Sequence, residues 1–196
     1  IQRIRSFVKR SEPNRSMSDV ATMVSNALEL ADIELRRHHV RLSHYSAARL
    51  PNIMVDPILI EQVLINLMKN AAESIEQAKR PNSRRTVELR VVPKQIEKQS
   101  VVEFSIVDSG KGLSEEVSAR LYEAFYSTKA EGMGIGLKLC RSIVESHQGR
   151  LDAENLYNGK EVVGCRFTFW LPVNPLLAVS STAAEPAGVK DGKSTL

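Results

Sequence analysis

Two adjacent segments of alternating hydrophobicity constrain the fold of this chain more than any other feature. Residues 85–95 read RTVELRVVPKQ and residues 101–109 read VVEFSIVDS. Apolar and polar residues alternate in both, which is typical of half-buried strands, and their proximity in the sequence predicts an antiparallel hairpin. A hairpin excludes an all-parallel sheet, whose strands are joined by longer crossovers.

Helical and extended patterns alternate along the rest of the chain. This interleaved order, together with the hairpin, predicts a two-layer α/β sandwich in which a mixed sheet packs against about three helices. Asp56 and Pro57 suit the first turn of a long, largely buried helix. The expected helices are 19–37, 57–78, 114–125 with Ser114 as its cap, and one from Leu137 onward; the other expected strands are 40–46, 52–56, 150–155 and 165–173.

The composition predicts one soluble globular domain with a sizeable core. Of the 196 residues, 42% are hydrophobic and 26% are charged, and the net charge is +4. Only 5% are aromatic, which argues against base stacking and a nucleic-acid partner. No run is long enough to span a membrane. Cys140 and Cys165 lie in apolar surroundings without metal-ligand spacing, so we expect reduced core residues of a cytoplasmic domain.

Three glycines at every second position precede the helix expected from Leu137. Gly132, Gly134 and Gly136 each weaken a helix by roughly 1 kcal/mol relative to alanine. A helix N-terminus carries unpaired N–H groups and the positive end of the helix dipole, so a bare backbone there suits a phosphate. A flexible loop fits these residues as well. The spacing differs from the dinucleotide-binding and Walker A motifs.

A polar stripe runs along the apolar helix 57–78. Gln62, Asn66 and Asn70 are four residues apart and Glu73 follows three later, so all four share one helix face. Buried amides without partners cost roughly 1–3 kcal/mol each. These amides therefore need polar partners. Either a core hydrogen-bond network or a nucleotide, with Mg²⁺ bound to an asparagine oxygen, would supply them.

The strand 101–109 ends in Asp108, and Gly110 and Gly112 follow it. A buried carboxylate at a strand end can accept a hydrogen bond from an exocyclic amine such as that of adenine. An Asp-Ser-Gly turn is the commoner role of such a tripeptide.

Four ordered segments resemble the N, G1, F and G2 boxes of the ATP-binding catalytic domain of bacterial sensor histidine kinases. They are QVLINLMKNAAES, DSGKGL, LYEAFYSTK and GMGIGLKLCRSIVESHQG, and GCRFTFWLP is similar to the family's last strand. The likeness covers about Val40 to Pro172 and is greatest to the nitrogen-regulation and oxygen-sensing subgroup. It places the chain in the ATPase superfamily of gyrase, heat-shock chaperones and histidine kinases. It implies the Bergerat-type ATP-binding fold, with ATP and Mg²⁺ as cofactors.

The resemblance also implies roles for individual residues. Asn70 would be the Mg²⁺ ligand, and Asn66 would contact the phosphates or a metal-bound water. Lys129 would reach the β- or γ-phosphate and act with Asn66 in catalysis, while Asp108 would receive the adenine amino group. The other implied nucleotide-binding residues are Gly110, Gly112, Thr128, Gly132, Gly134, Gly136 and Leu137.

Two positions depart from the family pattern. Glu73 stands where many members carry a lysine or arginine that touches phosphate, so its role stays open. Cys165 stands where a small hydroxyl residue is frequent, and we expect it to be a core residue.

The resemblance implies that the phosphate acceptor is a histidine outside this chain. None of the four histidines, His38, His39, His44 and His147, has the sequence context that the family uses, and His147 is expected to be a structural cap near a helix end. The acceptor would lie on an upstream dimerisation domain of a homodimeric parent, and the sequence leaves open whether that parent is anchored to a membrane. That parent would then pass the phosphate to an aspartate of a response regulator.

The same resemblance suggests boundaries and two alternatives. Residues 1–15 would be the end of the second dimerisation helix, 16–175 the ATP-binding catalytic domain and 176–196 a flexible tail. One alternative is a serine kinase of the same fold that acts on an anti-sigma antagonist, against which the helical N-terminus argues. The other is a chaperone-type conformational module, in which a glutamate general base usually stands where this chain has Asn66.

Overall fold

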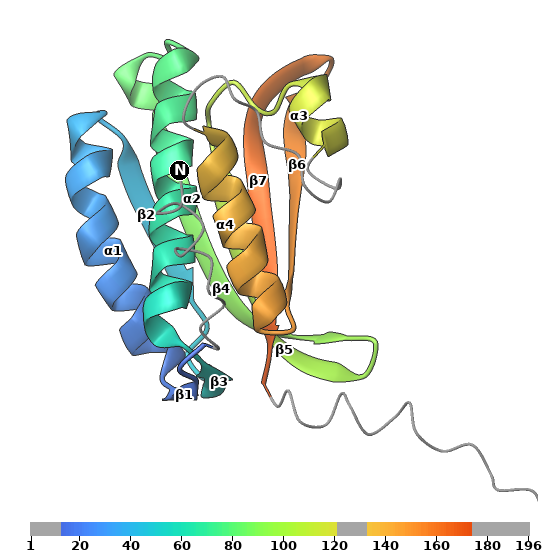
Figure 1. Cartoon of the computed structure of the whole chain (residues 1–196). Helices are drawn as coiled ribbons and strands as arrows, with labels where there is room; N and C mark the ends of the chain where they lie inside the picture. Colours follow the sequence, from blue (N-terminus) through green and yellow to red (C-terminus); the bar gives the residue numbers. More distant parts are fainter. Residues whose placement is uncertain (1–12, 121–132, 174–196) are drawn as a thin grey trace, which may run out of the picture.

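The computed structural model describes residues 13–120 and 133–173, and its centre is a five-stranded mixed sheet (Figure 1). The strand order is β2-β4-β5-β7-β6. The β2–β4 pair is parallel, and the other three pairs are antiparallel. The strands are β2 (Arg41–Ser46), β4 (Thr86–Ile96), β5 (Gln99–Asp108), β6 (Arg150–Asn158) and β7 (Glu161–Pro172).

Three helices cover one face of this sheet, and no helix of the described residues covers the other face (Figure 1). They are α1 (Val20–Arg37), α2 (Pro57–Gln77) and α4 (Met133–Ser146). The short α3 (Glu115–Arg120) and a 3-10 turn, η2 (Asn82–Arg84), lie outside this layer. The predicted two-layer α/β sandwich is therefore confirmed. Within the described ranges, no helix combines the length and apolar character that a membrane crossing requires.

The alternating segments form the predicted hairpin, and its register explains their pattern. β4 and β5 pair from Val87 opposite Asp108 to Ile96 opposite Gln99. Val87 is buried under the helices, as are the other apolar residues at alternate positions of β4, whereas the charged residues between them face outward. The rings of Phe104 and Phe169 stack with centroids 4.6 Å apart, and they join β5 to β7 in the core.

Aspartate caps fix where the first two long helices begin. Asp19 accepts a hydrogen bond from the Ala21 N–H, and Asp56 accepts one from the Leu59 N–H over 3.3 Å. Both helices end within one residue of the predicted position. A small antiparallel pair of β1 (Ser16–Ser18) with β3 (Ile53–Val55) was not fully predicted, because a three-residue strand has too few alternations to be seen in a sequence.

His147 joins the end of α4 to the beginning of α2. The Asp56 N–H donates to His147 Nε2 over 3.0 Å, and His147 Nδ1 lies 2.8 Å from the Ile143 carbonyl. Nε2 is thus the acceptor and Nδ1 carries the proton. Burial lowers the pKa of this imidazole, which keeps it neutral. The predicted structural role of His147 fits this arrangement, and the partner on α2 is what the sequence could not show.

Candidate functional site

The polar stripe of α2 lies along the side of the helix that faces α4, and its members differ in their surroundings. Gln62 is exposed, whereas Asn66, Asn70 and Glu73 are half-buried. Gln62 Nε2 donates to Asn66 Oδ1 over 3.0 Å. Glu73 lies 3.9 Å from the Lys69 ammonium on the same helix. These contacts account for most of the stripe without any ligand.

Asn70 is the exception within the stripe. Its Nδ2 is buried and has no hydrogen-bond partner among the described residues. An unsatisfied buried amide costs roughly 1–3 kcal/mol, and an amide presents one carbonyl oxygen and one NH₂ group whose positions can exchange by a flip. The side chain therefore offers a hard oxygen ligand and a donor at one point, as a metal-bound phosphate requires.

Asn66 shows which part of α4 lies beside Asn70. The Asn66 side chain is within hydrogen-bonding reach of Cys140, whose Sγ also lies 3.8 Å from the Val63 carbonyl oxygen. α2 and α4 run in opposite directions along the sheet (Figure 1). A residue one turn after Asn66 in α2 is therefore level with the residue one turn before Cys140 in α4, since each turn advances about 5.4 Å along the helix axis. This places Asn70 level with Gly136.

α4 begins earlier than predicted, and this changes the position of its glycines. The helix starts at Met133 instead of Leu137, so Gly134 and Gly136 lie within its first turn and do not precede it. A Cβ added at Gly136 would have no described atom within 4 Å, so none of the described residues fills the space beside this glycine. Leu137 is half-buried against the core. Gly132, Thr128 and Lys129 lie outside the described residues.

Asp108, the last residue of β5, is a buried carboxylate with only 4% of its surface exposed. Burial raises its pKa from 3.8 to about 6, although backbone hydrogen bonds from Gly110 and Cys165 oppose the shift. The Gly110 N–H donates to Asp108 Oδ1 over 2.8 Å. The predicted Asp-Ser-Gly turn and a buried acceptor are therefore both present at this residue.

The loop 109–114, which follows Asp108, passes close to its neighbours and needs its two glycines. A Cβ at Gly110 would collide with Ser74 of α2. Gly112 has a φ of +76°, and a Cβ there would meet Val162 and lie 2.7 Å from Asn155 Oδ1. The loop, the second half of α2 and the start of α4 meet at the same end of the molecule, at the top of Figure 1.

Both cysteines are buried and free, as predicted. Burial raises the pKa of Cys140 and that of Cys165 to about 12, and for Cys165 the nearby Asp108 adds to the shift. Both stay thiols at neutral pH, so neither is suited to nucleophilic or metal chemistry. Cys165 pairs with Asp108 in the sheet, so this core residue also borders the candidate site.

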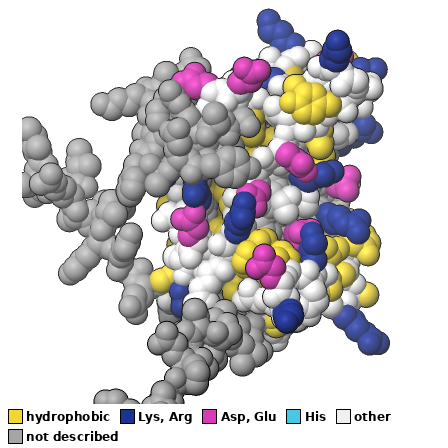
Figure 2. All heavy atoms as spheres, turned by 90° about the vertical axis from the view of Figure 1, so that its right-hand side faces the viewer, with side chains coloured by type: hydrophobic (Ala, Val, Ile, Leu, Met, Phe, Trp, Pro, Cys, Tyr) yellow, Lys and Arg dark blue, Asp and Glu magenta, His cyan; other side chains and the backbone are white. Residues whose placement is uncertain are grey.

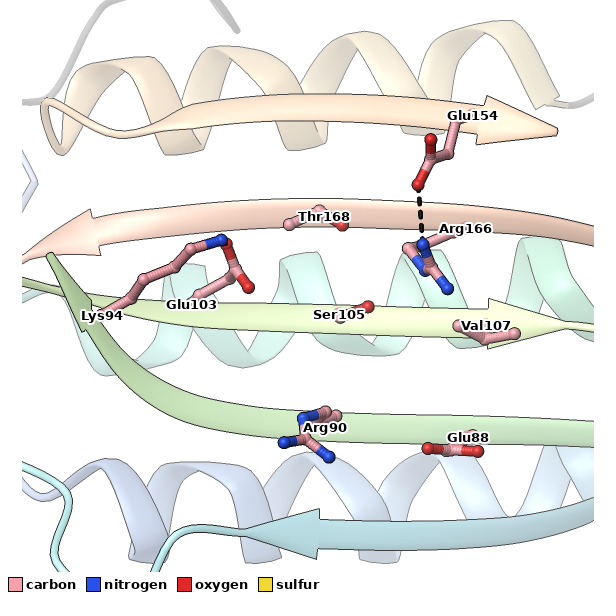
Figure 3. Close-up of a pocket in the computed structure, with 9 residues that line it drawn as sticks. All are labelled: Glu88, Arg90, Lys94, Glu103, Ser105, Val107, Glu154, Arg166 and Thr168. Atoms are coloured by element: carbon pink, nitrogen blue, oxygen red, sulfur yellow. Dashed lines mark hydrogen bonds and ion pairs between the residues drawn. The ribbon is translucent and has the colours of Figure 1, made fainter. Parts of the chain in front are cut away.

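A hollow on the opposite face of the sheet does not belong to this site. It is lined by outward-facing residues of β4, β5, β6 and β7 (Figure 3). Its charges pair across strands, with Lys94 Nζ 2.6 Å from Glu103 and Arg166 2.8 Å from Glu154. Figure 2 likewise shows basic and acidic side chains intermingled on one side of the molecule. We interpret this face as a solvated surface.

Three residues at the candidate site were not predicted. Ser74 and Asn155 hold the loop 109–114 through their side chains. Gly164 of β7 lies so close to β5 that a Cβ there would collide with the Asp108 carbonyl oxygen. In the sequence, only the glycine of GCRF drew attention to one of these three positions. The contacts themselves could not be predicted, because they join residues 36 to 56 positions apart.

Comparison with known proteins agrees with this geometry. A family model described as "Histidine kinase-, DNA gyrase B-, and HSP90-like ATPase" matches residues 55–175. The C4-dicarboxylate transport sensor protein DctS of Rhodobacter capsulatus is 38% identical over 173 residues, which are 88% of this chain and 25% of that protein. Sensor protein FixL of Bradyrhizobium diazoefficiens is 33% identical over 172 residues, 88% of this chain and 32% of that protein. The chain thus spans a quarter to a third of these relatives.

Solved structures show the same fold. The catalytic domain of histidine kinase ThkA has a TM-score of 0.62 at 24% identity, over 83% of this chain and 99% of that one. Full-length ShkA in complex with AMPPNP has a TM-score of 0.64 at 22% identity, over 86% of this chain and 33% of that one. The predicted likeness to sensor histidine kinases is confirmed.

Proposed function

We propose that the catalytic domain of this chain binds Mg²⁺-ATP and transfers the γ-phosphoryl group to a histidine. The chain belongs to the histidine kinase-, DNA gyrase B- and HSP90-like ATPase family. The acceptor histidine lies on the dimerisation domain of the same parent, which works as a homodimer in the cytoplasm. A response-regulator aspartate receives the phosphate next. Such transfer depends mainly on positioning and on neutralising charge.

The observation that carries this proposal is the buried amide nitrogen of Asn70 without a partner among the described residues. Asn70 is level with the half-buried backbone at Gly136, and one turn from Asn66, which is hydrogen-bonded to Gln62. Its oxygen suits Mg²⁺ and its NH₂ group suits a phosphate oxygen. Bound Mg²⁺ would supply positive charge at the phosphates, and the N-terminal turn of α4 adds backbone N–H groups and its dipole.

The base end of the nucleotide is assigned to Asp108 and the loop 109–114. Asp108 accepts hydrogen bonds, and it is buried at the end of β5. A carboxylate can pair with the amino group of adenine but faces the carbonyl oxygen of guanine, so this residue favours ATP over GTP. Gly110 and Gly112 let the backbone come close to the base.

The remaining assignments stay predictions. Thr128, Lys129 and Gly132 would contact the phosphates. Lys129 would also act in catalysis together with Asn66, and its ammonium group would serve as a point charge. Asn66 is a neutral amide, which cannot take a proton from water as a general base does. This favours phosphoryl transfer to a protein over the chaperone-type use of ATP.

Substitution of Asn70 tests the proposal. Asn70→Ala should raise the Kd for ATP about tenfold or more in the presence of Mg²⁺, because a metal ligand and a phosphate donor are both lost. In EDTA the difference should be much smaller. Gln77→Ala, which removes an exposed amide of the same helix, is the matched control. Calorimetric titration gives both constants, and circular dichroism checks the fold. Equal Mg²⁺-ATP affinity of Asn70→Ala and the unaltered chain would sink the assignment.

A further inference from the structure

Three side chains from three different elements hold the backbone of the loop 109–114. Asp108 of β5 accepts from the Gly110 N–H over 2.8 Å, and Ser74 of α2 accepts from the Lys111 N–H over 3.2 Å. Asn155 of β6 accepts from the Leu113 N–H over 2.7 Å. The loop is thus fixed at its beginning, middle and end by groups that lie far apart in the sequence.

Asn155 makes the most complete of these contacts. Besides accepting from the Leu113 N–H, its Nδ2 donates to the Leu113 carbonyl oxygen over 2.8 Å. The side-chain amide therefore bonds both polar groups of one residue, as a neighbouring strand would do. It also closes the space beside Gly112, whose hypothetical Cβ would lie 2.7 Å from Asn155 Oδ1.

The sheet register aligns Asn155 with the carboxylate assigned to the base. Asp108 of β5 is opposite Cys165 of β7, and Cys165 is opposite Asn155 of β6. Residues directly opposite each other in paired strands project from the same face of a sheet. Asp108 and Asn155 thus stand in one row on the helix-covered face, at the two ends of the loop. Their separation is set by two rigid strand pairings.

We infer that Asn155 is a positioning residue for base recognition, which holds the loop 109–114 at the distance from Asp108 that admits adenine. This inference rests on the proposed function. Without Asn155, the end of the loop keeps the packing of Leu113 against the core and the connection to Ser114, which caps α3 through the Val117 N–H, but no side-chain hydrogen bond to the Leu113 backbone among the described residues. Asp108 itself stays in place, because β7 and the Gly110 N–H hold it. A displaced loop should therefore weaken contacts to the base more than contacts to the phosphates.

Two variants test this inference, and a third is the control. Asn155→Ala removes both hydrogen bonds. Asn155→Asp is nearly the same size, but at neutral pH it places an acceptor against the Leu113 carbonyl. Asn158→Ala changes an exposed asparagine of the same strand. The Kd values for ATP and GTP with Mg²⁺ are measured by calorimetry, and thermal unfolding without nucleotide reports on the fold.

We expect the preference for ATP over GTP to fall about tenfold in both Asn155 variants, the order of effect of losing one or two ordinary hydrogen bonds. Asn158→Ala should keep the preference. An unchanged preference in both Asn155 variants, or equal weakening of ATP and GTP, would overturn the inference and leave the proposed function standing. An unaltered chain that binds no ATP, or binds ATP and GTP equally, would overturn both.

Discussion

Asp108 illustrates at the residue scale how the binding role that we propose for it conflicts with stability. A carboxylate that is 4% exposed loses most of its hydration, and burial raises its pKa to about 6. Two backbone N–H groups, from Gly110 and Cys165, compensate only in part. An aspartate in a purely structural turn would normally keep its solvent contact. The burial is thus explained better by a ligand that supplies the missing hydrogen bond than by the turn alone.

The raised pKa of Asp108 predicts a specific pH dependence. The folded chain holds this proton more tightly than the unfolded chain, whose carboxyl has a pKa near 3.8. The contribution of Asp108 to the free energy of unfolding therefore falls as the pH rises from about 4 to about 6, and is constant above that. Asp108→Asn should abolish this decline and raise the ligand-free stability at pH 7.5 by about 1–3 kcal/mol.

Urea unfolding of both chains between pH 4 and pH 8 measures this effect. The same substitution should weaken ATP binding and reduce the preference over GTP, because an amide can turn its NH₂ group toward the base. Asp19→Asn, at an exposed helix cap, is a control for loss of charge. A ligand-free Asp108→Asn chain that is less stable than the unaltered one at pH 7.5 would contradict our account of the burial.

At the scale of elements, α4 connects two ends of the molecule. Its first turn contains Gly134 and Gly136, of which Gly136 is level with Asn70, and the residue after its last turn, His147, is bonded to the Asp56 cap of α2. Arg15 adds a hydrogen bond to the Ser146 carbonyl, so the chain before β1 also contacts this end. Packing of Cys140, Ile143 and Val144 keeps the middle of α4 in the core. The glycines therefore weaken only the end that borders the candidate site.

Gly136→Ala should raise the stability of the fold and weaken the binding of ATP. Alanine favours a helix by about 1 kcal/mol over glycine, and the added Cβ meets no described atom within 4 Å. We expect the free energy of unfolding to rise by about 0.5–1 kcal/mol, while the Kd for Mg²⁺-ATP rises severalfold because the methyl group occupies space assigned to the phosphates. Ser142→Ala, exposed on the same helix, should leave binding unchanged. Urea unfolding and calorimetry test the pair, and tighter ATP binding by Gly136→Ala would refute the assignment.

At the scale of the whole molecule, the four histidines are all within the described residues, and none is placed as an acceptor. His147 is buried, with hydrogen bonds at both ring nitrogens. It follows the last residue of α4, a 14-residue helix, and so lies about 20 Å from the glycine turn. His38 lies between Glu34 and Glu76, at 3.3 and 2.6 Å. His44 bonds Ser46 on β2, and His39 follows α1.

We therefore predict that this chain binds ATP without labelling itself. Radiolabelled ATP should give at least tenfold less label on the chain alone than on a dimerisation domain of a related sensor kinase supplied in trans. Labelling in trans should itself be weak, because tethering normally raises the acceptor concentration to about the millimolar range. The label should be lost in acid and kept in alkali, as a phosphoramidate is.

Acid and alkali treatment of the labelled gel bands distinguishes the alternatives. Strong labelling of the chain on any of its own histidines would show that the acceptor is misplaced in our proposal. Acid-stable label on the added partner would favour the serine kinase of the same fold. Rapid ATP hydrolysis without any label would favour the chaperone-type module.

The sequence by itself determined the types of the long elements and the family of the protein. Alternation in β4 and β5, helical spacing in α1 and α2, and the caps Asp19 and Asp56 are local properties, because periodicity and capping involve residues within one or two turns. The motif around Asn70 and the glycine spacing are local as well. For this reason the hairpin, the two-layer sandwich and the likeness to sensor kinases could be predicted.

Only the tertiary structure decided which of these residues differ from their neighbours in burial and hydrogen bonding. Gln62, Asn66 and Asn70 are equivalent in helical spacing, yet only the Asn70 Nδ2 is buried without a partner in the described part of the chain. Asn155 lies 42 residues from Leu113, and its role becomes visible only when β6 and β7 are in register. Burial and hydrogen bonding of a side chain depend on elements that fold beside it from elsewhere in the sequence, and no local pattern records them.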